Sequence, residues 1–148
     1  MALTFKLKKH LIEDGSITFH PYVKVTLSHK GKSREVTAVL DTGADLIYIP
    51  KNMAEYFELP LSEKSFEGKT PQGCFEYKTS KMAIEIGKAH EKYKKEFVVT
   101  VPIKGGEYEE VILGVEFLSQ FKATFDYANE HIVLKKSEKK VNLRKNPG

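Results

Sequence analysis

The chain has 148 residues, of which 41% are apolar and 30% charged, and it contains a single cysteine, Cys74. This length is typical of one domain, and the composition is that of a globular protein rather than a disordered or fibrous one. One cysteine excludes an intramolecular disulfide framework and a multi-cysteine zinc site. No apolar run approaches the ~18 residues of a transmembrane helix, and the alternating N-terminus lacks the pattern of a secretory signal. We therefore expect a soluble, cytoplasmic protein.

The net charge of +4 is concentrated at the C-terminal end. Residues 135–148 carry six basic side chains and one acidic one, so the remainder of the chain is nearly neutral. We predict a single folded domain over residues 1–135, followed by a basic tail over residues 136–148. A solvated tail is the simplest interpretation, and contact with an acidic partner or nucleic acid is the alternative.

Most of the chain shows the period-two alternation of apolar and polar residues that is typical of strands with one face on a core. In chain order, the alternating segments are residues 3–7, 23–27, 82–86 and 97–103. Turn signals such as Asp14-Gly15 and Gly105-Gly106 separate them. Many short strands with regular turns predict an all-β sandwich or closed barrel.

Helical signals are short and few. Residues 52–59 can form about two turns, with Asn52 as the N-cap and Pro60 as the stop. Residues 115–121 can form a second short helix after Gly114. Two apolar runs, residues 123–127 and 131–134, then predict a closing hairpin.

One motif interrupts the alternating strand pattern. Asp41-Thr42-Gly43 stands between the apolar runs 36–40 and 46–50. All three residue types are common in turns, so an ordinary turn is the first interpretation. A carboxylate between two apolar strands, however, is partly withdrawn from water and needs hydrogen bonds there. Thr42 can supply a hydroxyl, and Gly43 lets main-chain amides approach the carboxylate. This combination suits an acid presented at the floor of a cleft.

A second apolar strand runs into a glycine at residues 110–118, where Gly114 precedes the predicted short helix. Taken together, residues 40–45 and 112–118 resemble the motifs of the retropepsin-like, single-lobe aspartic proteases. The resemblance extends over residues 17–135. It implies an all-β, pepsin-like closed barrel with one or two short helices, and the activity of an aspartic endopeptidase without a metal or cofactor.

The resemblance also implies roles for individual residues. Asp41 corresponds to the catalytic aspartate, and Thr42 to the threonine that braces the two catalytic loops across a dimer axis. Gly43 and Asp45 correspond to residues that contact the substrate backbone. Several viral members carry an arginine directly after the second glycine, where this chain has Val115. The partner of Asp45 is therefore left open.

A hairpin flap closes the cleft in that family, some 25–30 residues after the catalytic aspartate. Residues 67–75 stand at that place in this chain, with two glycines around a Pro-Gln tip that suit a mobile hairpin. An ordinary surface turn is the alternative. The substrate-binding residues expected in the flap are Gly68, Lys69, Thr70, Pro71, Gln72 and Gly73.

The chain holds one Asp-Thr-Gly, whereas the acid–base mechanism of these proteases uses two carboxylates that share one proton. A C2 homodimer supplies Asp41 twice from the same patch of each subunit. We therefore expect a homodimer that acts on peptide or protein substrates, with a bell-shaped pH profile on the acidic side of neutral.

Two other functions are compatible with parts of the sequence. A peptide-binding module with weak or absent cleavage would use the same fold, and the intact Asp41-Thr42-Gly43 argues against it. A barrel that binds nucleic acid through the tail and a turn carrying Lys30, Lys32 and Arg34 conflicts with the near-neutral body. The sequence contains no H-E-x-x-H zinc motif, and Cys74 lacks the signature of a thiol nucleophile.

Overall fold

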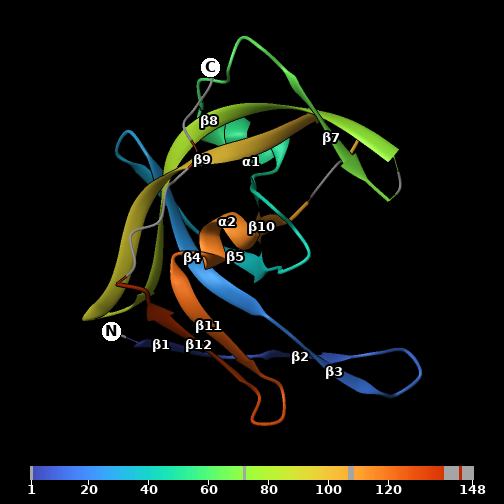
Figure 1. Cartoon of the computed structure of the whole chain (residues 1–148), viewed down its shortest axis with the longest axis vertical. Coiled ribbons are helices and arrows are strands. Elements are labelled where there is room, and N and C mark those ends of the chain that lie inside the picture. Colours follow the sequence, from blue (N-terminus) through green and yellow to red (C-terminus); the bar gives the residue numbers. More distant parts are fainter. Residues whose placement is uncertain (1, 72, 107–108, 139–143, 145–148) are drawn as a thin grey trace.

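The computed structural model describes residues 2–71, 73–106, 109–138 and 144. Strands predominate, and two short helices, α1 (Lys51–Tyr56) and α2 (Val115–Leu118), lie among them (Figure 1). The strands are β1 (Ala2–Lys6), β2 (Lys8–Leu11), β3 (Ile17–His20), β4 (Tyr22–His29), β5 (Lys32–Leu40), β6 (Ile47–Tyr48), β7 (Phe66–Thr70), β8 (Gly73–Lys88), β9 (Glu91–Lys104), β10 (Val111–Leu113), β11 (Phe121–Asp126) and β12 (His131–Lys136).

Six strands form a closed barrel in the order β4-β5-β10-β6-β9-β8, and pairing between β4 and β8 closes the ring. β7 continues the sheet beyond β8. A separate sheet has the order β1-β12-β11, and β2 pairs with β3 in a two-stranded hairpin. The all-β closed barrel with two short helices that the sequence predicts is therefore confirmed.

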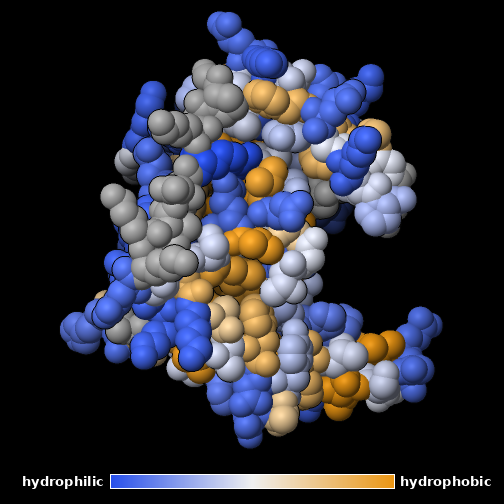
Figure 2. Space-filling model, viewed as in Figure 1, coloured by the Kyte–Doolittle hydropathy of each residue, from blue (hydrophilic) through white to orange (hydrophobic). Residues whose placement is uncertain are grey.

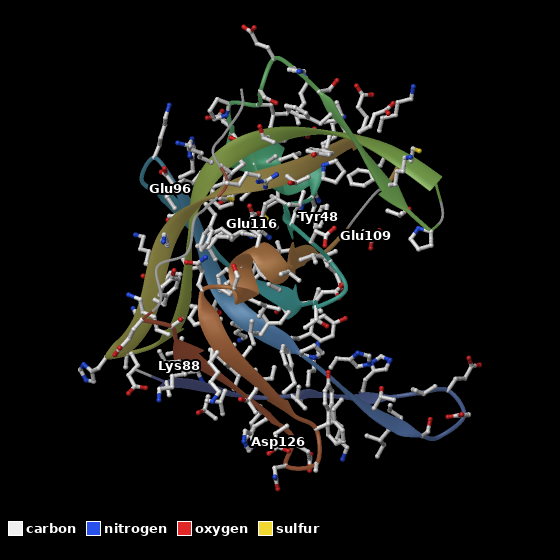
Figure 3. The ribbon with its side chains drawn as sticks, viewed as in Figure 1. Tyr48, Lys88, Glu96, Glu109, Glu116 and Asp126 are labelled. Atoms are coloured by element: carbon white, nitrogen blue, oxygen red, sulfur yellow. The ribbon has the colours of Figure 1, made fainter. Side chains whose placement is uncertain are left out.

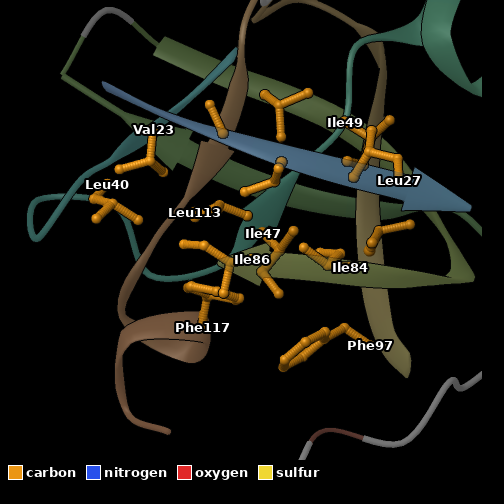
Figure 4. Packing of buried hydrophobic residues seen from close by; sticks show 14 of the residues in the cluster. Val23, Leu27, Leu40, Ile47, Ile49, Ile84, Ile86, Phe97, Leu113 and Phe117 are labelled. Atoms are coloured by element: carbon orange, nitrogen blue, oxygen red, sulfur yellow. The ribbon is translucent and has the colours of Figure 1, made fainter. Parts of the chain in front are cut away.

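The barrel interior is filled by the apolar residues of the alternating segments. Val25 and Leu27 of β4 lie opposite Ile86 and Ile84 of β8 in the pairing that closes the ring. All four are at most 1% exposed. Phe117 of α2 joins the same cluster (Figure 4), so the short helix covers one side of the core. This packing fixes the barrel strands that carry the loops described below.

Both helices are shorter than the sequence predicts, and the first one also begins at a different residue. The first helix begins at Lys51 after Pro50, and Asn52 is not its N-cap. It ends at Tyr56, where Glu58 adopts a positive φ of 52° and the amide of Leu59 donates to the carbonyl of Ala54. These features form a Schellman-type C-terminus, which stops the helix before Pro60 does. The second helix is also shorter than predicted, because the chain enters β11 at Phe121.

The closing hairpin predicted near the C-terminus is present as β11 and β12, each somewhat longer than the apolar runs that indicated it. The first strand, β1, pairs with β12 over its whole length. The N-terminal and C-terminal strands thus share one sheet. No helix in the described part of the chain is long and apolar enough to cross a membrane.

Candidate active site

Asp41 directly follows β5, at the place where β10 lies between β5 and β6 in the barrel. β10 is inserted between β5 and β6, parallel to β5 and antiparallel to β6, so that Leu113 pairs with both Leu40 and Ile47. The loop 41–46 connects β5 to β6 around the end of β10. The amide of Asp41 donates to the carbonyl of Leu113 over 3.0 Å, which ties the start of this loop to the inserted strand.

The side chain of Asp41 is held by the loop's own backbone. Its Oδ1 accepts a hydrogen bond of 2.8 Å from the amide of Gly43, and its carbonyl accepts one of 3.2 Å from the amide of Ala44. A Cβ at position 43 would lie 3.1 Å from the same Oδ1, so glycine permits this close approach. Asp41 is half-buried, as the sequence predicts, and its carboxylate is oriented by a main-chain donor.

Three other residues of the loop face solvent, whereas Ala44 and Leu46 are half-buried. Thr42, Gly43 and Asp45 are all exposed, and they stand within four positions of Asp41. The loop lies on the same side of the molecule as the tip of the β7–β8 hairpin (Figure 1). The structure therefore brings the four loop residues that the sequence singled out to one open face.

The second glycine motif supports this loop from behind. The amides of Gly114, Val115 and Glu116 donate to the carbonyls of Leu46, Ala44 and Asp45 over 3.1, 2.8 and 3.0 Å respectively. These three bonds join the first turn of α2 to the loop that carries Asp41. They give a physical reason for the two separated strand-to-glycine motifs of the sequence, since each motif holds the other.

Gly114 has no room for a side chain. A Cβ at this position would overlap the carbonyl oxygens of Ala44 and Leu46, which are the acceptors of the bonds just described. The overlap is with backbone atoms that cannot rotate away. Glycine at position 114 is therefore required by the close approach of α2 to the loop.

The predicted flap region forms a hairpin. β7 and the start of β8 pair from Phe66 with Tyr77 to Thr70 with Gly73, and Gly73 at the turn has a φ of 140°. Thr70 Oγ1 donates to the carbonyl of Gly73 over 3.1 Å. Gly68, Lys69, Thr70, Pro71 and Gly73 thus lie on the hairpin, whereas Gln72 lies outside the described residues.

Aromatic contacts connect the hairpin to the barrel. Phe75 is only 5% exposed, and its ring lies 5.6 Å from Tyr77 and 6.2 Å from Tyr48 of β6. A Cβ on Gly68 would overlap the Phe75 ring, so glycine lets that ring cross the opposite strand. Cys74 is exposed on β8 in the same hairpin. Tyr48, labelled in Figure 3, belongs to β6, the strand that directly follows the loop 41–46. The contact between Phe75 and Tyr48 therefore joins the hairpin to the strand next to that loop.

One charged contact next to α2 has no signal in the sequence. Arg144, in the segment predicted to be a solvated tail, places Nε 2.9 Å from Oε2 of Glu116 on α2. Its Nη2 also donates to the carbonyl of Val98 and to Thr100 Oγ1. The two side chains are 23% and 12% exposed, so at this residue the tail is packed against the barrel. Nothing in a lysine-rich segment distinguishes such an arginine beforehand.

Burial raises the pKa of Glu116, and the nearby guanidinium of Arg144 opposes that rise. The guanidinium of Arg144 therefore favours the ionised form of the Glu116 carboxyl, whereas burial disfavours it. Within the described ranges, no three His, Cys, Asp or Glu side chains come together in a group that could hold a metal ion.

Comparison with known proteins gives a consistent assignment. A family model described as gag-polyprotein putative aspartyl protease matches residues 25–120. A retropepsin-like aspartic protease from Rickettsia conorii has a crystal structure that aligns over 90% of each chain, with a TM-score of 0.53 and 16% identity. At that identity the likeness shows a shared fold.

Two viral structures align over smaller parts of this chain. The EIAV protease complexed with the inhibitor HBY-793 covers 68% of this chain and 86% of its own, with 18% identity and a TM-score of 0.45. The solution structure of the simian foamy virus protease covers 66% of this chain and 91% of its own, with 18% identity and a TM-score of 0.42. No curated protein matches the sequence.

Proposed function

Because this chain belongs to the family of gag-polyprotein putative aspartyl proteases, we propose that it is an aspartic endopeptidase whose active site is completed by a second copy of the chain. The observation that carries the proposal is the setting of Asp41. Its carboxylate is held by the amide of Gly43 on a loop whose Thr42, Gly43 and Asp45 are exposed, and the chain contains one such Asp-Thr-Gly motif. Each subunit thus contributes half of a two-carboxylate site.

The proposed reaction needs one Asp41 ionised and its symmetry mate protonated. The ionised carboxylate removes a proton from a water molecule, and the water oxygen attacks the carbonyl carbon of the scissile peptide bond. The protonated carboxyl donates a hydrogen bond to the carbonyl oxygen and stabilises the tetrahedral intermediate. When the C–N bond breaks, a proton passes to the leaving nitrogen, and two carboxyl groups with one shared proton remain.

The surrounding residues fit this chemistry. Thr42 is exposed beside Asp41, where its hydroxyl can brace the partner's loop across the twofold axis. Gly43 and Asp45 present main-chain and carboxylate groups on the open face, which suits hydrogen bonding to an extended peptide. We assign the role of flap to residues 67–75, because the hairpin stands on the same side as the loop and can close over a bound peptide (Figure 1).

The test is digestion of a denatured protein at acidic pH, with and without a statine-type inhibitor. The wild-type chain is expected to cleave, and the inhibitor is expected to stop it. Asp41→Asn keeps an oxygen to accept the Gly43 amide but loses the carboxylate, so activity should fall by at least about 10³-fold. Glu55→Gln, an exposed acid on α1, is the matched control and should retain wild-type activity.

Two outcomes would contradict the proposal. Cleavage by Asp41→Asn at the wild-type rate would remove Asp41 from the reaction. A folded wild-type chain that binds peptides without cleaving them, at any concentration or pH, would instead favour a peptide-binding module on the same fold.

A further inference from the structure

The β2–β3 hairpin stands apart from the rest of the sheet structure. Among the residues that the structure describes, β2 and β3 pair with each other and with no other strand. The hairpin projects from the barrel as a separate arm (Figure 1). An isolated two-stranded hairpin is only marginally stable in water, so an arm of this kind gains stability when another surface covers it.

The outer part of this arm is apolar. Leu11 is 70% exposed and Ile17 is 48% exposed, and the two face each other in register. Ile12, at the start of the turn, is 37% exposed. Hydrophobic side chains gather on the projecting arm in the space-filling view (Figure 2). Three large aliphatic side chains at one tip form a small patch without a cover within the described chain.

The arm is well formed. The amide of Ile12 donates to the carbonyl of Ser16, and the amide of Gly15 donates to the carbonyl of Ile12. Asp14 accepts hydrogen bonds from both the amide and the hydroxyl of Ser16. These bonds close a four-residue turn. At the base, the ring of His20 lies 5.4 Å from that of His10. The apolar tip is therefore presented by an ordered hairpin.

The position of the arm is fixed relative to Asp41 by backbone pairing. β4 and β5 are antiparallel, and Tyr22, the first residue of β4, pairs with Val39 near the end of β5. The carbonyl of Pro21 accepts the amide of Leu40, the residue immediately before Asp41. The arm thus begins at the end of the barrel from which the catalytic loop emerges. Four residues of strand extend it by about 13 Å beyond that point.

The molecule is concave between the arm and the β7–β8 hairpin (Figure 2), and the loop that follows β5 lies on this side (Figure 1). The proposed two-chain site brings a second catalytic loop up to the first across a twofold axis. An element that reaches outward next to this loop must then run along the second subunit. The proposed two-chain site therefore indicates that a second copy of this chain covers the β2–β3 hairpin.

We propose that the β2–β3 hairpin is a dimerisation arm whose apolar tip, Leu11, Ile12 and Ile17, packs on a second copy of this chain. This inference rests on the proposed function, because the need for two Asp41 residues places the second copy on this side. By twofold symmetry, each subunit both gives an arm and receives one. Substrate cleavage then depends on a segment that contributes no group to the chemistry.

The test uses the full chain with the paired substitutions Leu11→Lys and Ile17→Glu. Because the two positions face each other, the new side chains form an opposite-charge pair that preserves the hairpin while removing its apolar surface. Leu61→Lys is the control, since Leu61 is another exposed aliphatic residue, 37% exposed on the segment between α1 and β7. Sedimentation across a dilution series measures the dimer dissociation constant, and cleavage is measured on the same samples.

The double variant is expected to raise the dissociation constant about tenfold or more, and to recover wild-type activity at high concentration. Leu61→Lys should leave both unchanged. Independently of any variant, amides of residues 8–20 in the wild-type chain should exchange more slowly above the dissociation constant than below it. An arm that serves another protein or a membrane would leave the dimer unaffected.

The failures of the two proposals are distinguishable. A cleaving wild-type dimer whose dissociation constant is unchanged in the double variant, and whose residues 8–20 show no added protection, overturns the arm and leaves the protease intact. A wild-type chain that stays monomeric at all concentrations overturns the two-chain site and the arm together.

Discussion

Arg144 forms an ion pair with Glu116 across 28 positions of the chain, with Nε of the arginine 2.9 Å from Oε2 of the glutamate. Glu116 is the second residue of α2, and its amide donates to the carbonyl of Asp45 in the loop 41–46. Arg144 therefore holds α2 in place, and α2 in turn holds the loop 41–46 through its main-chain hydrogen bonds.

Removing this arginine should destabilise the fold in a pH-dependent way. Burial raises the pKa of Glu116 above its ordinary 4.5, and Arg144 lowers it. An acid with a raised pKa favours the folded state below its unfolded pKa and loses that contribution as the pH rises through the folded value. In Arg144→Met the pKa of Glu116 rises further. The loss of stability should thus be greatest near neutral pH, at about 1–3 kcal/mol, and shrink toward pH 4.

Urea unfolding at neutral pH and near pH 4 measures this difference. Lys135→Met, which removes the same charge from an exposed position on β12, is the control and should show little change at either pH. The double variant Arg144→Met/Glu116→Gln should recover most of the lost stability, because no uncompensated charge stays buried. An equal loss at both pH values would show that the arginine acts through packing alone.

Gly114→Ala should damage the fold at the loop that carries Asp41. The new methyl group would overlap the carbonyl oxygens of Ala44 and Leu46, so α2 must move away from the loop. We expect a loss of about 3 kcal/mol or more in the free energy of unfolding, together with loss of cleavage. Thermal and urea unfolding measure the first effect. A variant with wild-type stability and activity would mean that α2 and the loop can move apart enough to accommodate a methyl group, which would contradict the close approach at Gly114.

Gly68→Ala tests the hairpin that we assign as the flap. A methyl group at this position would displace the Phe75 ring, which packs between Gly68 and the barrel. The overlap is with a side chain, so the hairpin can shift without unfolding the barrel. We expect a several-fold rise in KM with a smaller change in kcat and in overall stability, because peptide binding depends on the hairpin's position. Unchanged kinetics in a folded Gly68→Ala variant would argue against a role for the hairpin in binding substrate.

The barrel and the catalytic-loop candidates could be predicted because they rest on local signals. The alternation along residues 23–27 and 82–86 requires one buried face, and turn-forming residues at Asp41-Thr42-Gly43 interrupt two apolar runs. The resemblance then gave Asp41 a role that the pattern alone leaves open. The structure adds the main-chain hydrogen bond from Gly43 that orients the carboxylate.

The features that escaped prediction depend on contacts between distant segments. Asn52 has the right chemistry for an N-cap, yet the chain enters α1 through the buried Pro50, because the preceding strand fixes where the helix begins. The ion pair of Arg144 joins two positions that no local pattern relates. The pairing of β1 with β12 likewise joins the two ends of the chain, and alternation alone names no partner for either strand.

The central claim, that two chains each give one Asp41 to a single site, is tested most directly by mixing wild-type chains with Asp41→Asn chains. Equal amounts are combined under conditions where subunits exchange, and cleavage is compared with the same total concentration of wild-type protein. If both carboxylates are needed, only dimers of two wild-type chains cleave, and activity falls to about a quarter. A fall to only about a half would mean that each chain works with its own carboxylate, which would contradict the shared site.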